Sequence, residues 1–245
     1  MNKRFTHLLA LVLLLTCANS PAADTASHSA NTPAPRGDRG WQDRAKLLDQ
    51  RLKETPDTQV LFIGDSITQG WEGGGAKEIW ESNFAKYKAV NLGIGGDRTQ
   101  HVLWRLKNAP LDGVKPKAAV VMIGTNNSNG EDNTPGQIAG GIAAVVKMLR
   151  ERLPGTKVLL LGIFPRGENF NPQRGKITQI NQVLPKLADE QNVFYMDIGH
   201  HFLELDGHLP ANIMPDYLHL SAKGYELWAK AIEGKLAQLA GTSGE

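Results

Sequence analysis

Ser66 stands at the end of an apolar run, in the stretch LFIGDSITQGW at positions 61–71. A serine hydroxyl is a weak nucleophile at neutral pH, so it needs a base within hydrogen-bond reach. His219 is a candidate base. Asp216, three residues before it, is a candidate carboxylate that would fix the imidazole tautomer and balance its charge. These three residue types predict acyl transfer through a covalent intermediate, provided that the fold brings them together.

Donors for the other half of such a reaction are also present. Attack on a carbonyl carbon creates an oxyanion, which prearranged N–H groups stabilise. We expect the backbone N–H groups of Ser66 and Gly96 and the side-chain amide of Asn126 to form this oxyanion hole. Glycine at position 96 leaves the approach of the substrate oxygen unobstructed.

Each of these residues also has a purely structural interpretation. Serine is a favoured helix N-cap, and asparagine is a common turn residue. Glycines after a strand mark tight turns in any protein of this class, and Asp216 and His219 taken singly fit a loop turn and a surface histidine. The coincidence of all of these features at the ends of successive predicted strands favours the catalytic interpretation.

The elements that must position these residues alternate along the chain. Nearly continuous apolar runs predict buried strands, and helix-like segments separate them. This alternation predicts a mainly parallel sheet, in which ligands bind beyond the carboxyl ends of the strands. The expected strands are 59–64, 89–93, 118–124, 157–163 and 193–198, and the expected helices are 41–54, 98–108, 135–153, 176–191 and 221–239.

The N-terminus predicts export. Lys3 and Arg4 precede an apolar run at 8–17 that is too short to span a bilayer, and small residues before position 23 suit cleavage after Ala22. We therefore expect a signal peptide at 1–22, a periplasmic or extracellular location, and no transmembrane segment in the mature chain. Cys17 raises a lipoprotein anchor as the less favoured alternative.

Residues 23–40 are small and polar, rich in alanine, proline and serine, and without an apolar period. This composition predicts a disordered linker. The rest of the chain, 41–240, has no internal repeat and no break in composition, so we expect one domain there.

Composition and motifs exclude several other functions. The 27 basic and 25 acidic residues give a net charge of +2 without a basic stripe, which argues against nucleic acid as a partner. A dinucleotide fingerprint beginning at Gly93 would need glycine at position 98, where Arg98 stands. His200, His201 and His208 are the one histidine cluster in the sequence, and adjacent histidines on an extended segment would point apart, so we expect no metal site. We expect no cofactor either, because activated serine chemistry needs none.

Four motifs resemble the conserved blocks of the SGNH (GDSL) hydrolase family: GDSITQGW, NLGIGGDRT, GTNN and DYLHLS. Within that family, NLGIGGDRTQHVLWRL (91–106) and FPRGE (164–168) are most similar to the platelet-activating factor acetylhydrolase Ib catalytic subunits. The resemblance implies a flavodoxin-like three-layer α/β/α sandwich with a five-stranded, mainly parallel sheet. It also implies catalytic Ser66, Asp216 and His219, an oxyanion hole at Ser66, Gly96 and Asn126, and a homodimer as one possible assembly.

The expected function is an exported serine esterase that hydrolyses small acyl esters, chiefly acetyl esters of glycans or small molecules, through an acyl-enzyme. A lysophospholipase-like or thioesterase-like activity on longer acyl chains is the alternative, and a non-catalytic carbohydrate-binding or scaffold module is the alternative from another class. Candidate residues for the rim of the substrate pocket are Trp71, Arg98, Arg166, Phe170 and Tyr217. Packing in the core or in a loop is an equal alternative for Phe170 and Trp71.

Overall fold

Five parallel strands form the centre of the molecule. The computed structural model describes residues 27–241, and the predicted signal peptide at 1–22, including Cys17, lies outside them. The strands are β1 (Val60–Gly64), β2 (Val90–Gly93), β3 (Ala118–Met122), β4 (Lys157–Leu161) and β5 (Val193–Met196). They pair in the order β2-β1-β3-β4-β5, and every pair is parallel. This order places the first and third strands side by side, which is the flavodoxin-like arrangement.

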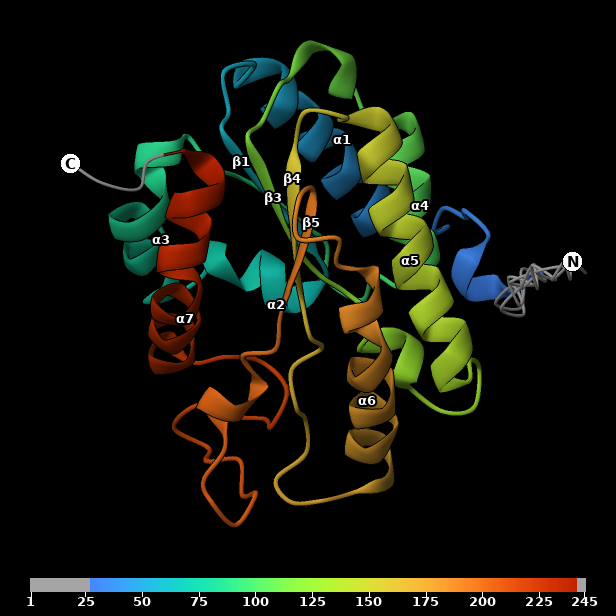
Figure 1. The fold of residues 1–245 in the computed structure, drawn as a ribbon, viewed down its shortest axis with the longest axis vertical. Coiled ribbons are helices and arrows are strands. Elements are labelled where there is room, and N and C mark those ends of the chain that lie inside the picture. Colours follow the sequence, from blue (N-terminus) through green and yellow to red (C-terminus); the bar gives the residue numbers. More distant parts are fainter. Residues whose placement is uncertain (1–26, 242–245) are drawn as a thin grey trace, which may run out of the picture.

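Helices cover both faces of this sheet (Figure 1). One face packs against α1 (Arg39–Glu54), α4 (Thr99–Asn108), α5 (Pro135–Arg152) and α6 (Pro172–Val183). The other packs against α3 (Ala76–Phe84) and α7 (Ala222–Ala240), and the short α2 (Ser66–Gln69) follows β1. Along β1, Leu61 and Ile63 join the first core, whereas Val60 and Phe62 join the second. The predicted three-layer fold is confirmed.

Short 3-10 helices complete the described elements. They are η1 (Ser29–Asn31), η2 (Gly70–Glu72), η3 (Ala85–Tyr87), η4 (Leu111–Gly113), η5 (Asn126–Ser128), η6 (Leu184–Leu187) and η7 (Gly199–Phe202). No helix within residues 27–241 has the length and apolar character needed to cross a membrane.

Two helices differ from the expected ones. The helix expected at 176–191 begins earlier, at Pro172, and ends at Val183, because Pro185 has no N–H to continue the helical hydrogen bonds. Asn171 caps its first turn by accepting a hydrogen bond from the Arg174 N–H. Helix α3 was not expected, since its nine residues carry too few apolar positions to show a clear period.

The disordered linker expected at 23–40 is wrong over the part that the structure describes. Ala30 is fully buried, and its carbonyl accepts a hydrogen bond from the Thr99 hydroxyl at 2.7 Å. The Ala34 N–H donates to the Gln100 carbonyl, and the Asn133 amide donates to the Ser29 hydroxyl at 2.8 Å. The composition of this segment predicted disorder because the residues that order it lie about 70 to 100 positions further along the chain. Local composition does not reveal such distant partners.

The turn between β1 and α2 is built around a buried carboxyl. Asp65 caps α2 by accepting a hydrogen bond from the Ile67 N–H at 3.0 Å, and its second oxygen has no partner among the described residues. Burial, assisted by the nearby Asp97 carboxylate, raises the pKa of Asp65 to about 7, against the lowering effect of the Ile67 N–H. The Gly-Asp-Ser turn therefore buries the Asp65 carboxyl, whose pKa is raised, directly before Ser66 in the chain.

Close backbone approach explains the glycine at the end of β2. A Cβ atom on Gly93 would lie 2.3 Å from the Gln69 nitrogen and 2.9 Å from the Asp65 carbonyl oxygen. Both are backbone atoms of the β1–α2 turn, so they cannot move aside as a flexible side chain would. The turn that carries Ser66 thus packs directly onto β2.

Gly93→Ala is expected to destabilise the fold by about 1–3 kcal/mol, the usual cost of overpacking a well-packed interior. Urea unfolding of the variant and the parent protein measures this difference. Gly113→Ala is the control, since a Cβ atom there would lie more than 4 Å from the other atoms that the structure describes, apart from its chain neighbours. Equal stability of the two variants would contradict the close packing of the turn on β2.

Asp65→Asn is expected to change the pH dependence of stability. Because the pKa of Asp65 is raised from 3.8 to about 7 on folding, the folded state binds its proton more tightly, and stability falls as pH rises between those values. Asparagine caps a helix equally well and cannot ionise. The free energy of unfolding of the variant, relative to wild type, should therefore rise from pH 4 to pH 8 by on the order of a few kcal/mol.

Urea unfolding at several pH values tests this expectation. Asp112→Asn, at a side chain that is 93% exposed, is the control. A difference between Asp65→Asn and wild type that stays constant with pH would show that Asp65 ionises as readily in the folded as in the unfolded chain.

Candidate active site

Ser66 and His219 meet at the carboxyl edge of the sheet, although most of the domain separates them in sequence. Ser66 is the first residue of α2, and His219 lies in the loop that precedes α7. The serine Oγ is 2.9 Å from His219 Nε2, and His219 Nδ1 is 2.6 Å from Asp216 Oδ2. The three residues that were expected to act together therefore form one continuous hydrogen-bonded chain.

The Asp216 loop holds its own carboxylate in place. Asp216 Oδ1 accepts hydrogen bonds from the backbone N–H groups of Leu218 at 3.1 Å and His219 at 2.7 Å, while Oδ2 accepts from the imidazole. Between them Tyr217 adopts a positive φ of 58°, which closes the turn. Although burial raises the pKa of Asp216, the hydrogen bonds from His219 outweigh it, and the pKa is lowered overall. The carboxylate is thus anionic when it orients the imidazole.

The glycines after β2 form a tight turn beside Ser66. The Asp97 N–H donates to the Ile94 carbonyl at 3.1 Å, and Gly96, the third residue of this turn, has a φ of 76°. Such a conformation costs glycine little and other residues more. The Gly95 N–H donates to the Gln69 side chain at 2.7 Å, which ties the turn to α2.

The N–H groups of Ser66 and Gly96 have no acceptor among the described residues. Free N–H groups beside a nucleophile are the donors that an oxyanion requires. Asn126, at the start of η5 after β3, lies beside this glycine turn, since its Nδ2 donates to the Asp97 carbonyl at 2.9 Å. The glycine turn therefore contacts both Asn126 and the helix that begins at Ser66, and the oxyanion hole formed by these three residues stays a prediction.

Asp97 is a structural residue of the site that sequence reasoning missed. Its side chain is fully buried and accepts hydrogen bonds from Trp41 Nε1 at 2.7 Å and Arg105 Nε at 2.9 Å. Arg105 also donates to the Leu92 carbonyl. The aspartate in GGD, eight positions before an arginine on a predicted helix, was the available signal, but pairing across that distance depends on how the helix packs.

A second missed residue is Asn127. Its Oδ1 accepts from the Thr99 N–H at 2.9 Å, and its Nδ2 contacts Gln100 and Asn133 oxygens at 3.1 and 3.2 Å. Asn127 is completely buried. In the GTNN motif, therefore, the first asparagine bonds to the glycine turn after β2 and the second joins the loop to α4.

The residues expected at the rim of the substrate pocket lie in different parts of the structure. Trp71 is 1% exposed and packs against Tyr225 and Trp228, with ring centroids 4.4 and 5.1 Å away, so it belongs to the core. Arg98 forms an ion pair with Asp132 at 2.8 Å.

Arg166 lies closer to the catalytic groups. Its Nη1 donates to the Asn129 side chain at 3.0 Å. Burial lowers the pKa of Arg166, while the carboxylates of Asp65 and Asp216 act in the opposite direction, which places the guanidinium within electrostatic reach of both acids. The next residue, Gly167, donates its N–H to the Tyr217 carbonyl at 2.8 Å, so Arg166 lies between the loop after β3 and the Asp216 loop.

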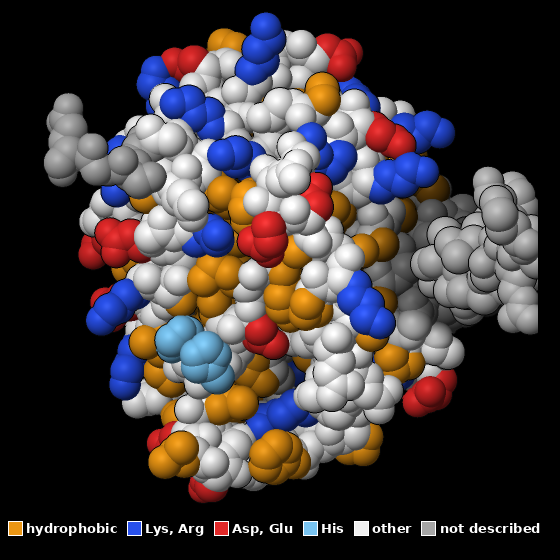
Figure 2. Space-filling view, viewed as in Figure 1, with side chains coloured by type: hydrophobic (Ala, Val, Ile, Leu, Met, Phe, Trp, Pro, Cys, Tyr) orange, Lys and Arg blue, Asp and Glu red, His pale blue; other side chains and the backbone are white. Residues whose placement is uncertain are grey.

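Phe170 lines a different cavity. This cavity of about 370 Å³ lies beside α6, and Arg174, Asp197 and His200 also line it. Phe170 is 76% exposed, and the Arg174 guanidinium lies 5.5 Å from the centre of its ring. Figure 2 shows histidine and hydrophobic side chains gathered around a hollow in the lower part of this face.

The histidine cluster differs from the expectation. His200 and His201 lie on η7, with ring centroids 4.0 Å apart, because a short helix rather than an extended segment carries them. Within residues 27–241, no group of three or more metal-ligand side chains comes together.

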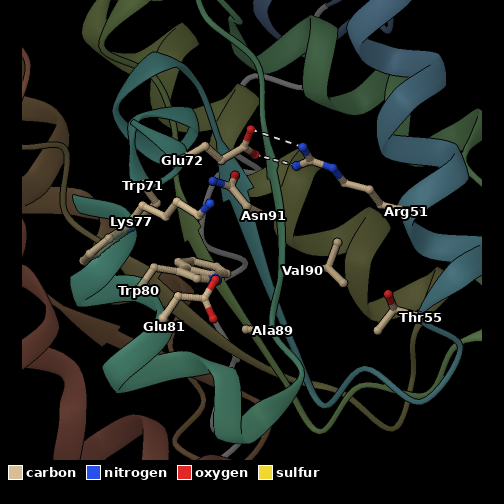
Figure 3. Close-up of a pocket in the computed structure, with 10 residues that line it drawn as sticks. All are labelled: Arg51, Thr55, Trp71, Glu72, Lys77, Trp80, Glu81, Ala89, Val90 and Asn91. Carbon is tan, nitrogen blue, oxygen red and sulfur yellow. Dashed lines mark hydrogen bonds and ion pairs between the residues drawn. The ribbon is translucent and has the colours of Figure 1, made fainter. Parts of the chain in front are cut away.

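A larger cavity of about 420 Å³ lies at the open edge of β2 (Figure 3). Two of its charged residues are paired with each other, since Glu72 forms an ion pair with Arg51 at 2.5 Å. Glu72 also forms an ion pair with Arg44 at 2.7 Å. The cavity is lined by Arg51, Thr55, Trp71, Glu72, Lys77, Trp80, Glu81, Ala89, Val90 and Asn91, none of which is a candidate catalytic residue.

Comparison with known proteins identifies relatives of this chain. Rat platelet-activating factor acetylhydrolase IB subunit alpha2 is 44% identical over 210 residues, which cover 83% of this chain and 86% of the rat protein. The human alpha1 subunit is 39% identical over 217 residues, which cover 86% and 90%.

Solved structures share the fold. A GDSL-like lipase from Bacteroides thetaiotaomicron VPI-5482 is similar with a TM-score of 0.63 and 19% identity, over 80% of this chain and 98% of that one. An acetylxylan esterase from Geobacillus stearothermophilus is similar with a TM-score of 0.59 and 22% identity, over 75% and 94%. The model of the GDSL-like lipase/acylhydrolase family matches residues 62–227. With its predicted family thereby confirmed, this chain belongs to the GDSL-like lipase/acylhydrolase (SGNH) family of serine esterases.

Proposed function

We propose that this chain is an exported serine esterase that removes small acyl groups, chiefly acetyl, from glycans or other small esters. The observation that carries the proposal is the hydrogen-bonded chain from Ser66 through His219 to Asp216, with distances of 2.9 and 2.6 Å. A non-catalytic module would not require these three side chains to be hydrogen-bonded in series beside the expected oxyanion donors.

Acylation follows from this geometry. The Asp216 carboxylate accepts the Nδ1–H of His219, so that Nε2 is left as the base. As Ser66 Oγ bonds to the carbonyl carbon, its proton passes to Nε2 and the carbonyl electrons move to oxygen. The N–H groups of Ser66 and Gly96 and the amide of Asn126 stabilise this oxyanion.

Collapse of the tetrahedral intermediate breaks the bond to the leaving alcohol, which takes the proton from Nε2. The acyl group then remains on Ser66 Oγ. A water molecule then gives its proton to His219 and attacks the acyl carbon. This forms a second tetrahedral intermediate, whose oxyanion is stabilised by the same donors. Release of the carboxylic acid returns the proton to Ser66.

Support for an acetyl substrate comes from the relatives. The names of the platelet-activating factor acetylhydrolase subunits and of the acetylxylan esterase both specify an acetyl group. Support for export comes from Lys3, Arg4 and the apolar run at 8–17. A homodimer, which the family resemblance suggests, stays a prediction.

A series of p-nitrophenyl esters from acetate to decanoate tests the acyl preference. We expect kcat/KM to be highest for acetate and to fall as the chain lengthens, with Ser66→Ala abolishing hydrolysis of every ester. Because one methylene changes binding in a pocket by only about 1–3 kcal/mol, the whole series is needed. A maximum at eight carbons or more would favour the lysophospholipase-like or thioesterase-like alternative, and activity that survives Ser66→Ala would refute the proposed nucleophile.

Asn126→Asp is expected to lower kcat by about 10²–10³ and to change KM little, because the amide donor acts on the transition-state oxyanion. Steady-state kinetics on p-nitrophenyl acetate measures both constants. Asn108→Ala is the control, since that amide lies at the exposed end of α4 and, among residues 27–241, donates only to the Trp104 carbonyl. A rise in KM with no loss of kcat would remove Asn126 from the oxyanion hole.

A further inference from the structure

The N-terminal segment Ser27–Asp38 lies against two of the loops that build the active site. The hydroxyl of Thr99, the first residue of α4, donates to the Ala30 carbonyl. Asn133, which the second GTNN asparagine contacts, donates to the Ser29 hydroxyl. The segment is thus attached to the start of α4 and to the loop before α5, which follow Gly96 and Asn126 in the sequence.

Arg36 is the residue of this segment that reaches the glycine turn. Its Nη1 donates to the Gly95 carbonyl at 2.6 Å. The same nitrogen lies 2.9 Å from the position that a Cβ atom on Gly96 would occupy. The guanidinium therefore fills the space beside Gly96 where any other residue would have a side chain.

Asp38 holds this guanidinium in a fixed orientation. Its Oδ2 accepts from Arg36 Nε at 2.9 Å, and its Oδ1 accepts from the Trp41 N–H as the cap of α1. The side chain of Arg36 is only 28% exposed. A long side chain that is anchored at two points in this way has little remaining freedom.

The bond to Gly95 acts on the oxyanion donor because of peptide geometry. The Gly95 carbonyl and the Gly96 N–H belong to one planar trans peptide group and point in opposite directions. A donor that holds the carbonyl on one side therefore directs the N–H to the other. Hydrogen bonding at the carbonyl also polarises the peptide and makes its N–H a stronger donor.

Glycine on both sides of this peptide makes such a restraint necessary. With no Cβ on Gly95 or Gly96, the peptide between them can rotate with little steric cost, and a rotated peptide would turn its N–H away from the substrate. The positive charge of Arg36 matters less, because the carboxylates of Asp38 and Asp97 lie 2.9 and 3.9 Å from the guanidinium and offset it.

We propose that Arg36 is a positioning residue of the active site, which holds the Gly95–Gly96 peptide so that the Gly96 N–H faces the oxyanion. This inference rests on the proposed esterase function. It makes the N-terminal segment part of the catalytic unit, although Arg36 itself is not expected to touch the reacting atoms.

Arg36→Ala in the full-length protein is expected to lower kcat for p-nitrophenyl acetate by roughly 10- to 100-fold, the loss typical of a misplaced reacting group, and to change KM less than about twofold. Arg36→Lys should lose less, because it keeps a donor for the Gly95 carbonyl but lacks the second contact to Asp38. Arg39→Ala is the matched control, since that side chain is 92% exposed and, within the described part of the chain, forms an ion pair only with Asp43.

Chemical rescue separates positioning from general stability. Millimolar guanidinium chloride, compared with sodium chloride at the same ionic strength, should restore part of the kcat of Arg36→Ala and leave Arg39→Ala unchanged. Thermal unfolding checks that the variants are folded, and Arg36→Lys provides the comparison if Arg36→Ala is not.

The outcomes distinguish the two proposals. Wild-type activity that depends on Ser66, combined with an unchanged kcat in folded Arg36→Ala, would overturn the role of Arg36 alone. If Arg36→Ala does not fold, an unchanged kcat in Arg36→Lys would do the same. A loss of kcat that guanidinium does not restore, accompanied by a lower unfolding temperature, would assign Arg36 to stability instead. Absence of Ser66-dependent hydrolysis in the wild type would overturn the esterase function, and the role of Arg36 with it.

Discussion

The hydrogen bond between the Ser66 hydroxyl and the His219 imidazole is the contact on which the chemistry of this protein depends. It joins the end of the first strand to the loop before the last helix, so the parallel sheet between them must be correctly assembled before the bond can form. A parallel sheet suits this task, because the carboxyl ends of all its strands lie at one edge. Each strand can then deliver one group to the same place without a change in the fold.

Buried polar groups hold these loops in relation to one another. Asp97 accepts from Trp41 on α1 and Arg105 on α4, and its own carbonyl accepts from Asn126 after β3. Removing one partner of such a set leaves a buried polar group unsatisfied, at a cost of about 1–3 kcal/mol or more. The loops that carry Gly96 and Asn126 are thus held by interactions whose loss would destabilise the protein. This suits donors that must be in place before the substrate arrives.

The N-terminal segment extends this network beyond the expected domain. Its small polar residues cannot form a core, yet Ala30 is fully buried and Arg36 bonds to the Gly95 carbonyl. Cleavage after Ala22, as predicted, would leave this segment on the mature protein. The same Asp38 that caps α1 also orients Arg36, so the start of the first helix and the glycine turn are connected by a single carboxylate.

The sequence by itself determined the class of fold, the family and the identity of the groups in the candidate site. Apolar runs between helical segments predicted the parallel sheet, and Ser66, Gly96, Asn126, Asp216 and His219 were found from residue types at strand ends. These features are local, since hydrophobic period and turn chemistry are written in adjacent residues. The Asp216–His219 pair is also local, because the two residues lie within one turn of four residues.

Tertiary structure alone decided which distant residues support that site. Nothing adjacent to Asp97 in the sequence shows that Trp41 and Arg105 bind it, and nothing in the composition of 23–40 shows that Arg36 reaches Gly95. The same holds for Trp71, which belongs to the aromatic core rather than to the pocket rim. Such contacts arise when whole helices pack on the sheet, and their energies depend on burial and on partners far along the chain, which a local pattern does not contain.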